Sequence, residues 1–327
     1  MRKTLSLFTI VFFVFSIFVY GKSDSSYILD LKSDANGIVL GESEEATTTT
    51  VATAKNPLPI NEEVITAPKR NDNGVDYDLK DGNAAVMDCT SGSFIYNKDS
   101  DKKVAIASIT KLATALVFLK KNIALDTVYE VKKGDRVEGG LLHLRTGDLV
   151  EVKDLLNLSL IASDNMATKA LVDASGVTSS EFVTEMNQFA KENNLNDTSF
   201  MDEIGLSENN LSTASDVAKL ANLAFANETI SGIVSQSKYL FTTKNGRPVT
   251  AKSTNVLLGD DEDGGMRIIG GKTGFTNTAG YCFVGKFIDE KNKSVISVVL
   301  NEGEKNSRFY QAKNLAKWAY DNFSWGN

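Results

Sequence analysis

The sequence predicts a mixed α/β or α+β fold, because segments of strand character stand near both ends of the chain and helical segments fill the middle. Two short apolar segments, 84–89 and 93–96, are joined by a turn and read as an early pair of strands. Three more strands are expected late in the chain, at 268–274, 280–287 and 295–300. The predicted sheet therefore combines two groups of strands that are distant in sequence.

The segments between these strands have helical character. Ser108 begins a run of strong helix formers whose apolar positions fall on one face. Further helical stretches are expected at 152–174, 179–193 and 213–226. Residues 307–322 have the pattern of a closing amphipathic helix, and no internal repeat is evident.

The N-terminus resembles an export signal. Arg2 and Lys3 precede a largely apolar run at 5–20, which gives the charged and apolar regions of a secretory signal. The run is short for a membrane-spanning helix, which needs about 20 residues, and Val19-Tyr-Gly21 is a weak cleavage pattern. Residues 1–21 are therefore expected to be a signal peptide or an N-terminal membrane anchor.

Residues 22–80 are polar and irregular and contain three of the four prolines, so they are predicted to be a disordered linker. Residues 81–327 remain for one domain, which is long enough to bury a full hydrophobic core. The chain carries 35 basic and 42 acidic residues and has a net charge of −7. No basic cluster suggests nucleic acid, and one histidine with two distant cysteines supports neither a metal site nor a cofactor.

Three motifs indicate a reactive serine: Ser108-Ile-Thr-Lys111, Ser163-Asp-Asn165 and Lys272-Thr-Gly274. None is specific alone, since Ser-x-x-Lys also occurs at Ser100 and Ser235. A serine hydroxyl is a weak nucleophile until a base takes its proton, and a lysine one helical turn away can do so once its pKa is lowered. Burial and a neighbouring cation, for which Lys272 is the candidate, would lower the pKa of Lys111.

With these motifs in this order, the chain resembles low-molecular-mass penicillin-binding proteins of the D-alanyl-D-alanine carboxypeptidase family. The resemblance covers roughly three quarters of the chain and includes the blocks 107–111, 160–165, 186–187, 198–200, 205–206, 212–214, 272–276 and 279–282. It implies the serine β-lactamase/transpeptidase fold, a five-stranded antiparallel sheet flanked by helices with a helical lobe. Residues 81–327 would then be a DD-peptidase catalytic domain.

The resemblance also implies roles for individual residues. Ser108 would attack the penultimate D-alanine carbonyl, with Lys111 as general base and Ser163 passing a proton to the leaving amine. Asn165 would bind the amide side of the substrate, and Lys272 would supply positive potential.

The resemblance also implies contacts with the terminal carboxylate of the substrate and with the oxygen of its scissile carbonyl. The Thr273 hydroxyl and Arg308 would bind the terminal carboxylate, and an arginine fork suits that group. Gly274 completes the third motif, and the backbone N–H groups of Ser108 and Phe275 would form the oxyanion hole.

The partners implied are peptidoglycan stem peptides, with β-lactams as covalent inhibitors, in an extracytoplasmic compartment. The chain would be secreted, or held at the membrane by its N-terminal segment if that segment is uncleaved. The main interpretation is a DD-carboxypeptidase, and the alternative is a DD-endopeptidase that cuts D-alanyl cross-links.

Two further alternatives carry less weight. A class A β-lactamase is suggested by Asp164 within the second motif and by Glu203-Ile-Gly-Leu206, but Ser207 stands where that loop should have asparagine. A non-catalytic peptidoglycan-binding relative is disfavoured because the four motif residues are all intact, namely Ser108, Lys111, Ser163 and Lys272.

Three other residues could suggest different chemistry. In an exported protein Cys89 and Cys282 invite a disulfide, but the resemblance puts another strand between theirs, so two separate buried thiols are expected. His143 would have to serve any Ser-His-Asp triad. The resemblance places it in a turn entering the helical lobe, where a structural or surface role is expected.

Overall fold

The computed structural model describes residues 66–259 and 265–326 of the chain. The expected export segment at 1–21 and the linker up to residue 65 lie outside these residues. Among the helices of the described part, none combines the length and the apolar character needed to cross a membrane.

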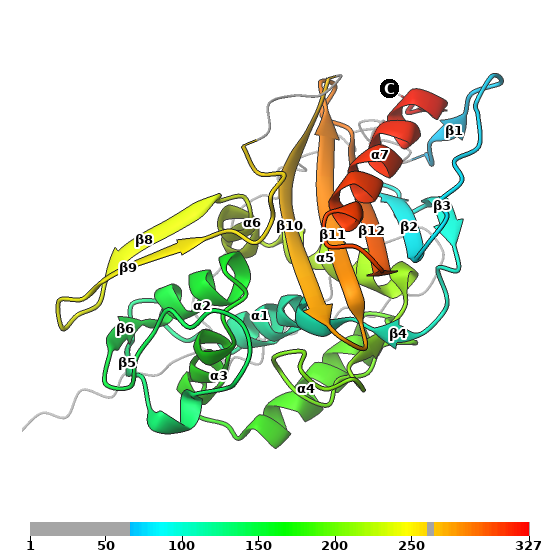
Figure 1. The fold of residues 1–327 in the computed structure, drawn as a ribbon. Helices are drawn as coiled ribbons and strands as arrows, with labels where there is room; N and C mark the ends of the chain where they lie inside the picture. Colours follow the sequence, from blue (N-terminus) through cyan, green and yellow to red (C-terminus); the bar gives the residue numbers. More distant parts are fainter. Residues whose placement is uncertain (1–65, 260–264, 327) are drawn as a thin grey trace, which may run out of the picture. The chain divides into compact units, whose positions relative to one another are not determined.

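A five-stranded antiparallel sheet is the centre of the fold (Figure 1), which confirms the predicted class. Its strands, in spatial order, are β10 (Met266–Thr276), β11 (Gly280–Asp289), β12 (Ser294–Glu302), β2 (Asn83–Asp88) and β3 (Phe94–Lys98). The early hairpin joins the late strands through β2 and β12, with Val86 opposite Ser297. All five predicted strands exist, and the three late ones are longer than predicted.

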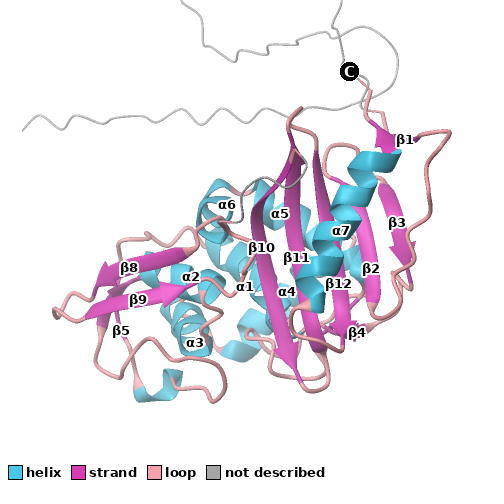
Figure 2. Ribbon diagram, turned by 45° about the horizontal axis from the view of Figure 1, so that its top comes forward, coloured by secondary structure: helices cyan, strands magenta, loops and turns pink. Residues whose placement is uncertain are grey.

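Both faces of the sheet are covered by helices, as Figure 2 shows. On one face lies α7 (Ser307–Asn322), which packs Phe309 and Leu315 into a cluster with Phe283 and Val299. On the other face α5 (Ala214–Ala226) and α1 (Lys111–Lys120) enclose the larger core. Burial on both faces explains why β12 is almost continuously apolar instead of alternating with polar residues.

The helical lobe contains α2 (Val152–Ile161), α3 (Asn165–Ala174), α4 (Ser179–Glu192) and the short α6 (Glu228–Val234). The sequence predicted one helix over 152–174, but the chain turns at 162–164, where Ser163 has a φ of +58°. Asp164 then caps α3 by accepting a hydrogen bond from the Ala167 N–H at 2.9 Å. Apolar periodicity continues through this break, which is why the pattern alone did not reveal it.

Several short paired strands were not predicted. They are β1 (Lys69–Arg70) with β13 (Phe323–Ser324), β4 (Val104–Ala105) with β7 (Leu211–Ser212), β5 (Val128–Glu130) with β6 (Leu149–Glu151), and β8 (Lys238–Thr242) with β9 (Pro248–Lys252).

Residues 66–80, the end of the predicted linker, belong to the packed unit. Lys69 pairs with Ser324, and the Val75 carbonyl accepts a hydrogen bond from the Trp318 indole at 2.7 Å. Leu79 is only 1% exposed within the cluster under α7. The predicted domain boundary at residue 81 is thus too late. Residues 66–80 pack against the domain because this mostly polar stretch contains a few apolar side chains that are buried there.

Both cysteines are free thiols. Cys282 is fully buried in β11, whereas Cys89 is half-buried just after β2. Strand β12 lies between β11 and β2, as the expected strand order required.

Candidate active site

Ser108 lies in a single 3₁₀ turn, Ala107–Thr110, that leads directly into α1. The sequence predicted a position on the helix itself. In a 3₁₀ turn residues three apart are eclipsed, and the Lys111 Nζ lies 2.8 Å from the Ser108 Oγ. The serine and lysine of the first motif therefore face each other as expected.

The backbone around Ser108 is held in an unusual conformation. Ala107 has a φ of +47°, a left-handed value that costs energy for a residue with a Cβ and recurs at functional sites. Gly205 presses against this turn so closely that a Cβ on it would lie 2.1 Å from the Ala107 carbonyl oxygen. On the opposite side a Cβ on Gly274 would lie 2.6 Å from the Ile106 carbonyl oxygen. The turn is wedged between loop 202–207 and β10.

Lys111 is fully buried, and its Nζ has three hydrogen-bond acceptors. They are the Ser108 Oγ at 2.8 Å, the Asn165 Oδ1 at 2.9 Å and the Ile204 carbonyl at 2.8 Å. Burial lowers the pKa of Lys111 to about 7, although the carboxylates of Asp164 and Asp202 act in the opposite direction. Of the two causes expected from the sequence, burial is the main one, and the Lys272 cation is not among the charges that act on this pKa.

Lys272 forms a second lysine–serine pair across the cleft. Its Nζ donates to the Ser163 Oγ at 2.8 Å and to the Thr273 carbonyl at 2.8 Å. Burial, together with the positive charges of Lys111 and Arg308, holds the pKa of Lys272 well below its ordinary value. Burial and the two neighbouring positive charges thus make this ammonium group easier to deprotonate than a free lysine side chain.

Asn165, the first residue of α3, contacts both Lys111 and the rim of the cleft. Its Oδ1 accepts from Lys111, and its Nδ2 donates to the Gly139 carbonyl at 3.0 Å. A substrate amide at Asn165 would therefore replace or share these contacts.

The residues expected to bind a carboxylate have protein partners as well. The hydroxyl of Thr273 lies 2.6 Å from that of Thr254. Arg308 is 5% exposed and donates to the carbonyls of Gly274 at 2.8 Å and Cys282 at 3.2 Å. It thus ties β10 to β11, a structural role that the sequence did not indicate.

These side chains surround a cleft with a volume of about 750 Å³. Of the predicted site residues, Ser108, Ser163, Asn165, Thr273, Gly274, Phe275 and Arg308 line it. Lys111 and Lys272 are not among the lining residues and reach it through the two serines.

Other lining residues were missed by sequence reasoning. They are Gly139, Gly140, Leu141, Ala162, Leu206, Ser253, Thr254, Val256, Thr276, Asn277, Lys305 and Phe309. Ala162, Leu206 and Thr276 fall within blocks that carry the family resemblance. Most of the others come from segments outside those blocks, where the paired glycines at 139–140 give a signal because tandem glycine marks a turn. Leu141, Val256 and Phe275 are exposed at 77%, 59% and 47%, so the cleft has apolar walls at several points.

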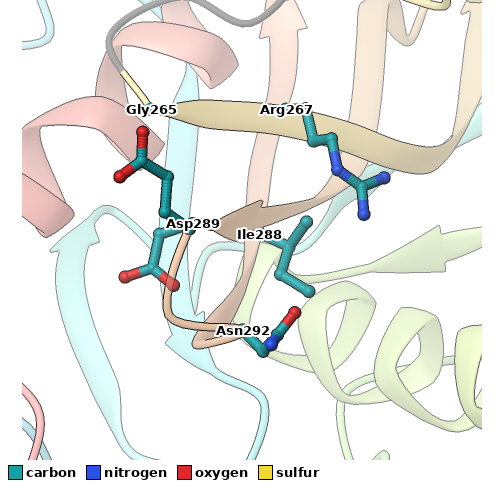
Figure 3. Close-up of a pocket in the computed structure, with 6 residues that line it drawn as sticks. Gly265, Arg267, Ile288, Asp289 and Asn292 are labelled. Carbon is teal, nitrogen blue, oxygen red and sulfur yellow. The ribbon is translucent and has the colours of Figure 1, made fainter.

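A smaller cavity of about 270 Å³ lies elsewhere, at the end of β10 and β11 where Gly265 begins the second described range (Figure 3). Arg267 and Asp289 line it. Asp289 accepts hydrogen bonds from the backbone N–H groups of Lys291 at 3.0 Å and Lys293 at 2.7 Å, so its carboxylate is engaged in its own turn. This cavity contains no serine–lysine pair and is not a rival to the main cleft.

The residues that suggested other chemistry have structural partners. Glu203 does not line the cleft, and its Oε1 accepts from the Ser179 hydroxyl at 2.9 Å. The His143 Nδ1 lies 2.9 Å from the Asp164 Oδ2, which also accepts from the His143 N–H at 2.8 Å. Asp164 thus joins the second motif to the segment that precedes the lobe, and His143 is a structural histidine.

Comparison with known proteins agrees with this geometry. A family described as D-alanyl-D-alanine carboxypeptidase matches residues 68–304. A D-alanyl-D-alanine endopeptidase of Escherichia coli is 32% identical over 245 residues, which are 74% of this chain and 77% of that protein. The D-alanyl-D-alanine carboxypeptidase DacF of Bacillus subtilis is 29% identical over 254 residues, 73% of this chain and 62% of that protein.

Among solved structures, that of a Streptomyces DD-transpeptidase superposes with a TM-score of 0.70 at 29% identity, covering 76% of this chain and 99% of that one. The likeness therefore extends over the sheet and the lobe together. With the family match spanning more than half of its length, the chain belongs to the D-alanyl-D-alanine carboxypeptidase family of serine peptidases.

Proposed function

We propose that this protein is a serine DD-carboxypeptidase that removes the terminal D-alanine from peptidoglycan stem peptides through an acyl-enzyme on Ser108. The observation that carries the proposal is the 2.8 Å contact between the Ser108 Oγ and the Lys111 Nζ. Burial lowers the pKa of that lysine to about 7, so a useful fraction is the neutral amine near neutral pH.

Acylation begins when the neutral amine of Lys111 takes the proton of the Ser108 hydroxyl as its oxygen attacks the substrate carbonyl. The backbone N–H groups of Ser108 and Phe275 stabilise the oxyanion, a contribution of about 3 kcal/mol per donor in comparable sites. The C–N bond then breaks, and the leaving amine takes a proton from the Ser163 hydroxyl. Lys272, which donates to that hydroxyl at 2.8 Å, replaces the proton. In deacylation a water molecule gives one proton to Ser163, which passes a proton back to Lys272, while the water oxygen attacks the ester. The C–O bond then breaks and Lys111 returns its proton to the Ser108 oxygen, which restores Ser108 and both lysines.

Arg308 and Thr273 orient the substrate through its terminal carboxylate. Both line the same cleft as Ser108, and a guanidinium pairs well with a carboxylate. Asn165 binds the amide on the other side of the scissile bond.

A DD-endopeptidase that cuts D-alanyl cross-links is the second candidate. The relatives in Escherichia coli and Pseudomonas aeruginosa are both named D-alanyl-D-alanine endopeptidases, and this chain covers 77% of each, against 62% of DacF. The volume of the cleft and its exposed Leu141 and Val256 offer room for more substrate than a single D-alanine.

The same chemistry supports β-lactams as covalent inhibitors of Ser108 and a location outside the cytoplasm, where peptidoglycan lies. It would act there either as a released protein or held at the membrane by residues 1–21.

Incubation with a stem pentapeptide and with a cross-linked muropeptide dimer, followed by mass analysis, separates the two activities. Release of D-alanine from the pentapeptide supports the carboxypeptidase, and cleavage of the dimer alone favours the endopeptidase. Ser108→Ala should abolish both reactions and labelling by a fluorescent penicillin. Ser235→Ala is the matched control, since it alters another Ser-x-x-Lys whose hydroxyl only donates to the Gly232 carbonyl at 3.2 Å. Labelling that survives Ser108→Ala would refute the assignment.

A further inference from the structure

Asp202 organises loop 202–207, which lies between the block at 198–200 and β7. Its carboxylate accepts hydrogen bonds from four backbone N–H groups of its own loop. The donors are Ile204 at 2.8 Å, Gly205 at 2.5 Å and Leu206 at 3.3 Å to Oδ1, and Ser207 at 2.5 Å to Oδ2. So many donors on one carboxylate fix the backbone conformation of the loop.

This loop forms one wall of the nucleophile's site. Its Ile204 carbonyl accepts the hydrogen bond from Lys111 at 2.8 Å, and its Glu203 carbonyl accepts one from the Thr114 hydroxyl at 2.6 Å. Gly205 makes the close approach to the turn that carries Ser108. A change in the shape of the loop would therefore move the base and the nucleophile relative to each other.

Asp202 also acts on Lys111 through its charge. The charged groups around Lys111 are Asp164 from the turn before α3, Asp202 from the loop, and Lys272 from β10. The two carboxylates raise the pKa of Lys111 and so oppose the effect of burial. Asp164 is also engaged with His143, whereas the partners of the Asp202 carboxylate come from its own loop and from Asn210.

We propose that Asp202 is a positioning residue of the Ser108 site. It holds the Ile204 carbonyl against the Lys111 amine, and its negative charge stabilises the ammonium form of that lysine. The inference rests on the proposed function, in which Lys111 is the base that activates Ser108.

Two variants of the whole chain separate the positional effect from the effect of charge. Asp202→Asn keeps one carbonyl oxygen, which can accept the three N–H groups now at Oδ1, but it removes the charge and the Oδ2 acceptor of the Ser207 N–H. Asp202→Ala removes both. The measurement is the rate of labelling by a fluorescent penicillin from pH 5 to pH 9, with a thermal melt of each variant.

For Asp202→Asn we expect a plateau rate within about threefold of the parent and an acid limb shifted to lower pH by about half a unit to one unit. The direction follows because loss of a nearby negative charge lowers the pKa of a lysine. For Asp202→Ala we expect the plateau rate to fall at least about tenfold, because the Ile204 carbonyl is no longer held in place.

Glu203→Gln is the control, because it neutralises the adjacent carboxylate, which contacts Ser179 and not the loop amides. It should change neither the plateau nor the acid limb. An acid limb of Asp202→Asn that stays in place or moves to higher pH overturns the inference, as does a folded Asp202→Ala that labels at the parent rate. If the melt shows that Asp202→Ala does not fold, the profile of Asp202→Asn decides alone.

Ser108→Ala distinguishes this inference from the function on which it rests. Labelling of Ser108→Ala would refute the proposed function itself. If Ser108→Ala is not labelled and Asp202→Asn has the same pH profile as the parent, the proposed function stands and only the role of Asp202 is refuted.

Discussion

Replacement of Arg308 by alanine has two separable consequences, because this side chain is both a part of the fold and the proposed partner of the substrate carboxylate. Its guanidinium is buried and donates to the carbonyls of Gly274 and Cys282. It also lies 4.6 Å from the ring of Phe309 and 5.3 Å from that of Tyr281. Arg308→Ala would leave two carbonyls at the junction of β10 and β11 without their donor.

The structural loss follows from these contacts. A hydrogen bond from a charged donor contributes about 1.5–3 kcal/mol, so losing two should lower the free energy of unfolding by about 3–6 kcal/mol. The substrate carboxylate adds a further loss of about 1.5–3 kcal/mol in kcat/KM, which corresponds to roughly 10-fold to 150-fold. Only the second loss depends on the substrate.

The assay therefore compares kcat/KM for a peptide with a free C-terminal carboxylate and for the same peptide amidated, below the melting temperature of the variant. Any distortion of the site affects both peptides and cancels in their ratio. Lys317→Ala, which removes an exposed cation from the same helix, should leave the ratio unchanged. Equal losses of Arg308→Ala on the two peptides would show that Arg308 serves the fold alone.

Three further predictions follow from the geometry of the site. The rate of Ser108 labelling should reach a plateau above about pH 7 and fall tenfold per unit below it, because Lys111 must lose its proton before it can act as base; a flat profile from pH 5 to pH 9 would contradict this. Gly205→Ala places a Cβ 2.1 Å from the Ala107 carbonyl oxygen, so it should lower the free energy of unfolding by more than about 2 kcal/mol and abolish labelling. Gly246→Ala, which has the same φ of +92° but lies in open space, should have neither effect. Equal denaturation midpoints for the two variants would refute the steric argument. Glu203→Gln should leave acyl-enzyme breakdown within a few-fold of the parent, and a loss of about a thousandfold, measured by release of the penicillin label, would instead support a lactamase mechanism.

Local patterns predicted much of this architecture. The five strands and the closing helix were identified because apolar periodicity and turn residues act over a few positions. Three-residue spacing likewise placed Ser108 beside Lys111, since it works in a 3₁₀ turn as well as in an α-helix.

The contacts that complete the site could not be predicted in this way. Gly205 presses against the turn that carries Ser108 through a close backbone approach, and the loop at 139–141 lines the cleft from outside the three motifs. The buried bonds of Arg308 depend on where α7 docks, and the turn at Ser163 interrupts a sequence whose apolar pattern continues through it. Each of these features is determined by tertiary packing, which here outweighs the local conformational preferences of the sequence.

The strand order of the central sheet has a consequence for how the protein acquires activity. Val86 of β2 pairs with Ser297 of β12, about 210 positions later, so the early hairpin cannot pair with its neighbour until the chain has been made as far as β12. Contacts between such distant segments slow folding, because a long loop must close before they form. Ser108 lies between the two segments, and its turn rests on β10, which belongs to the late group. The site of the proposed nucleophile is thus assembled only when β10 has folded against the Ser108 turn, and a nascent chain that has not reached β10 carries no preformed site.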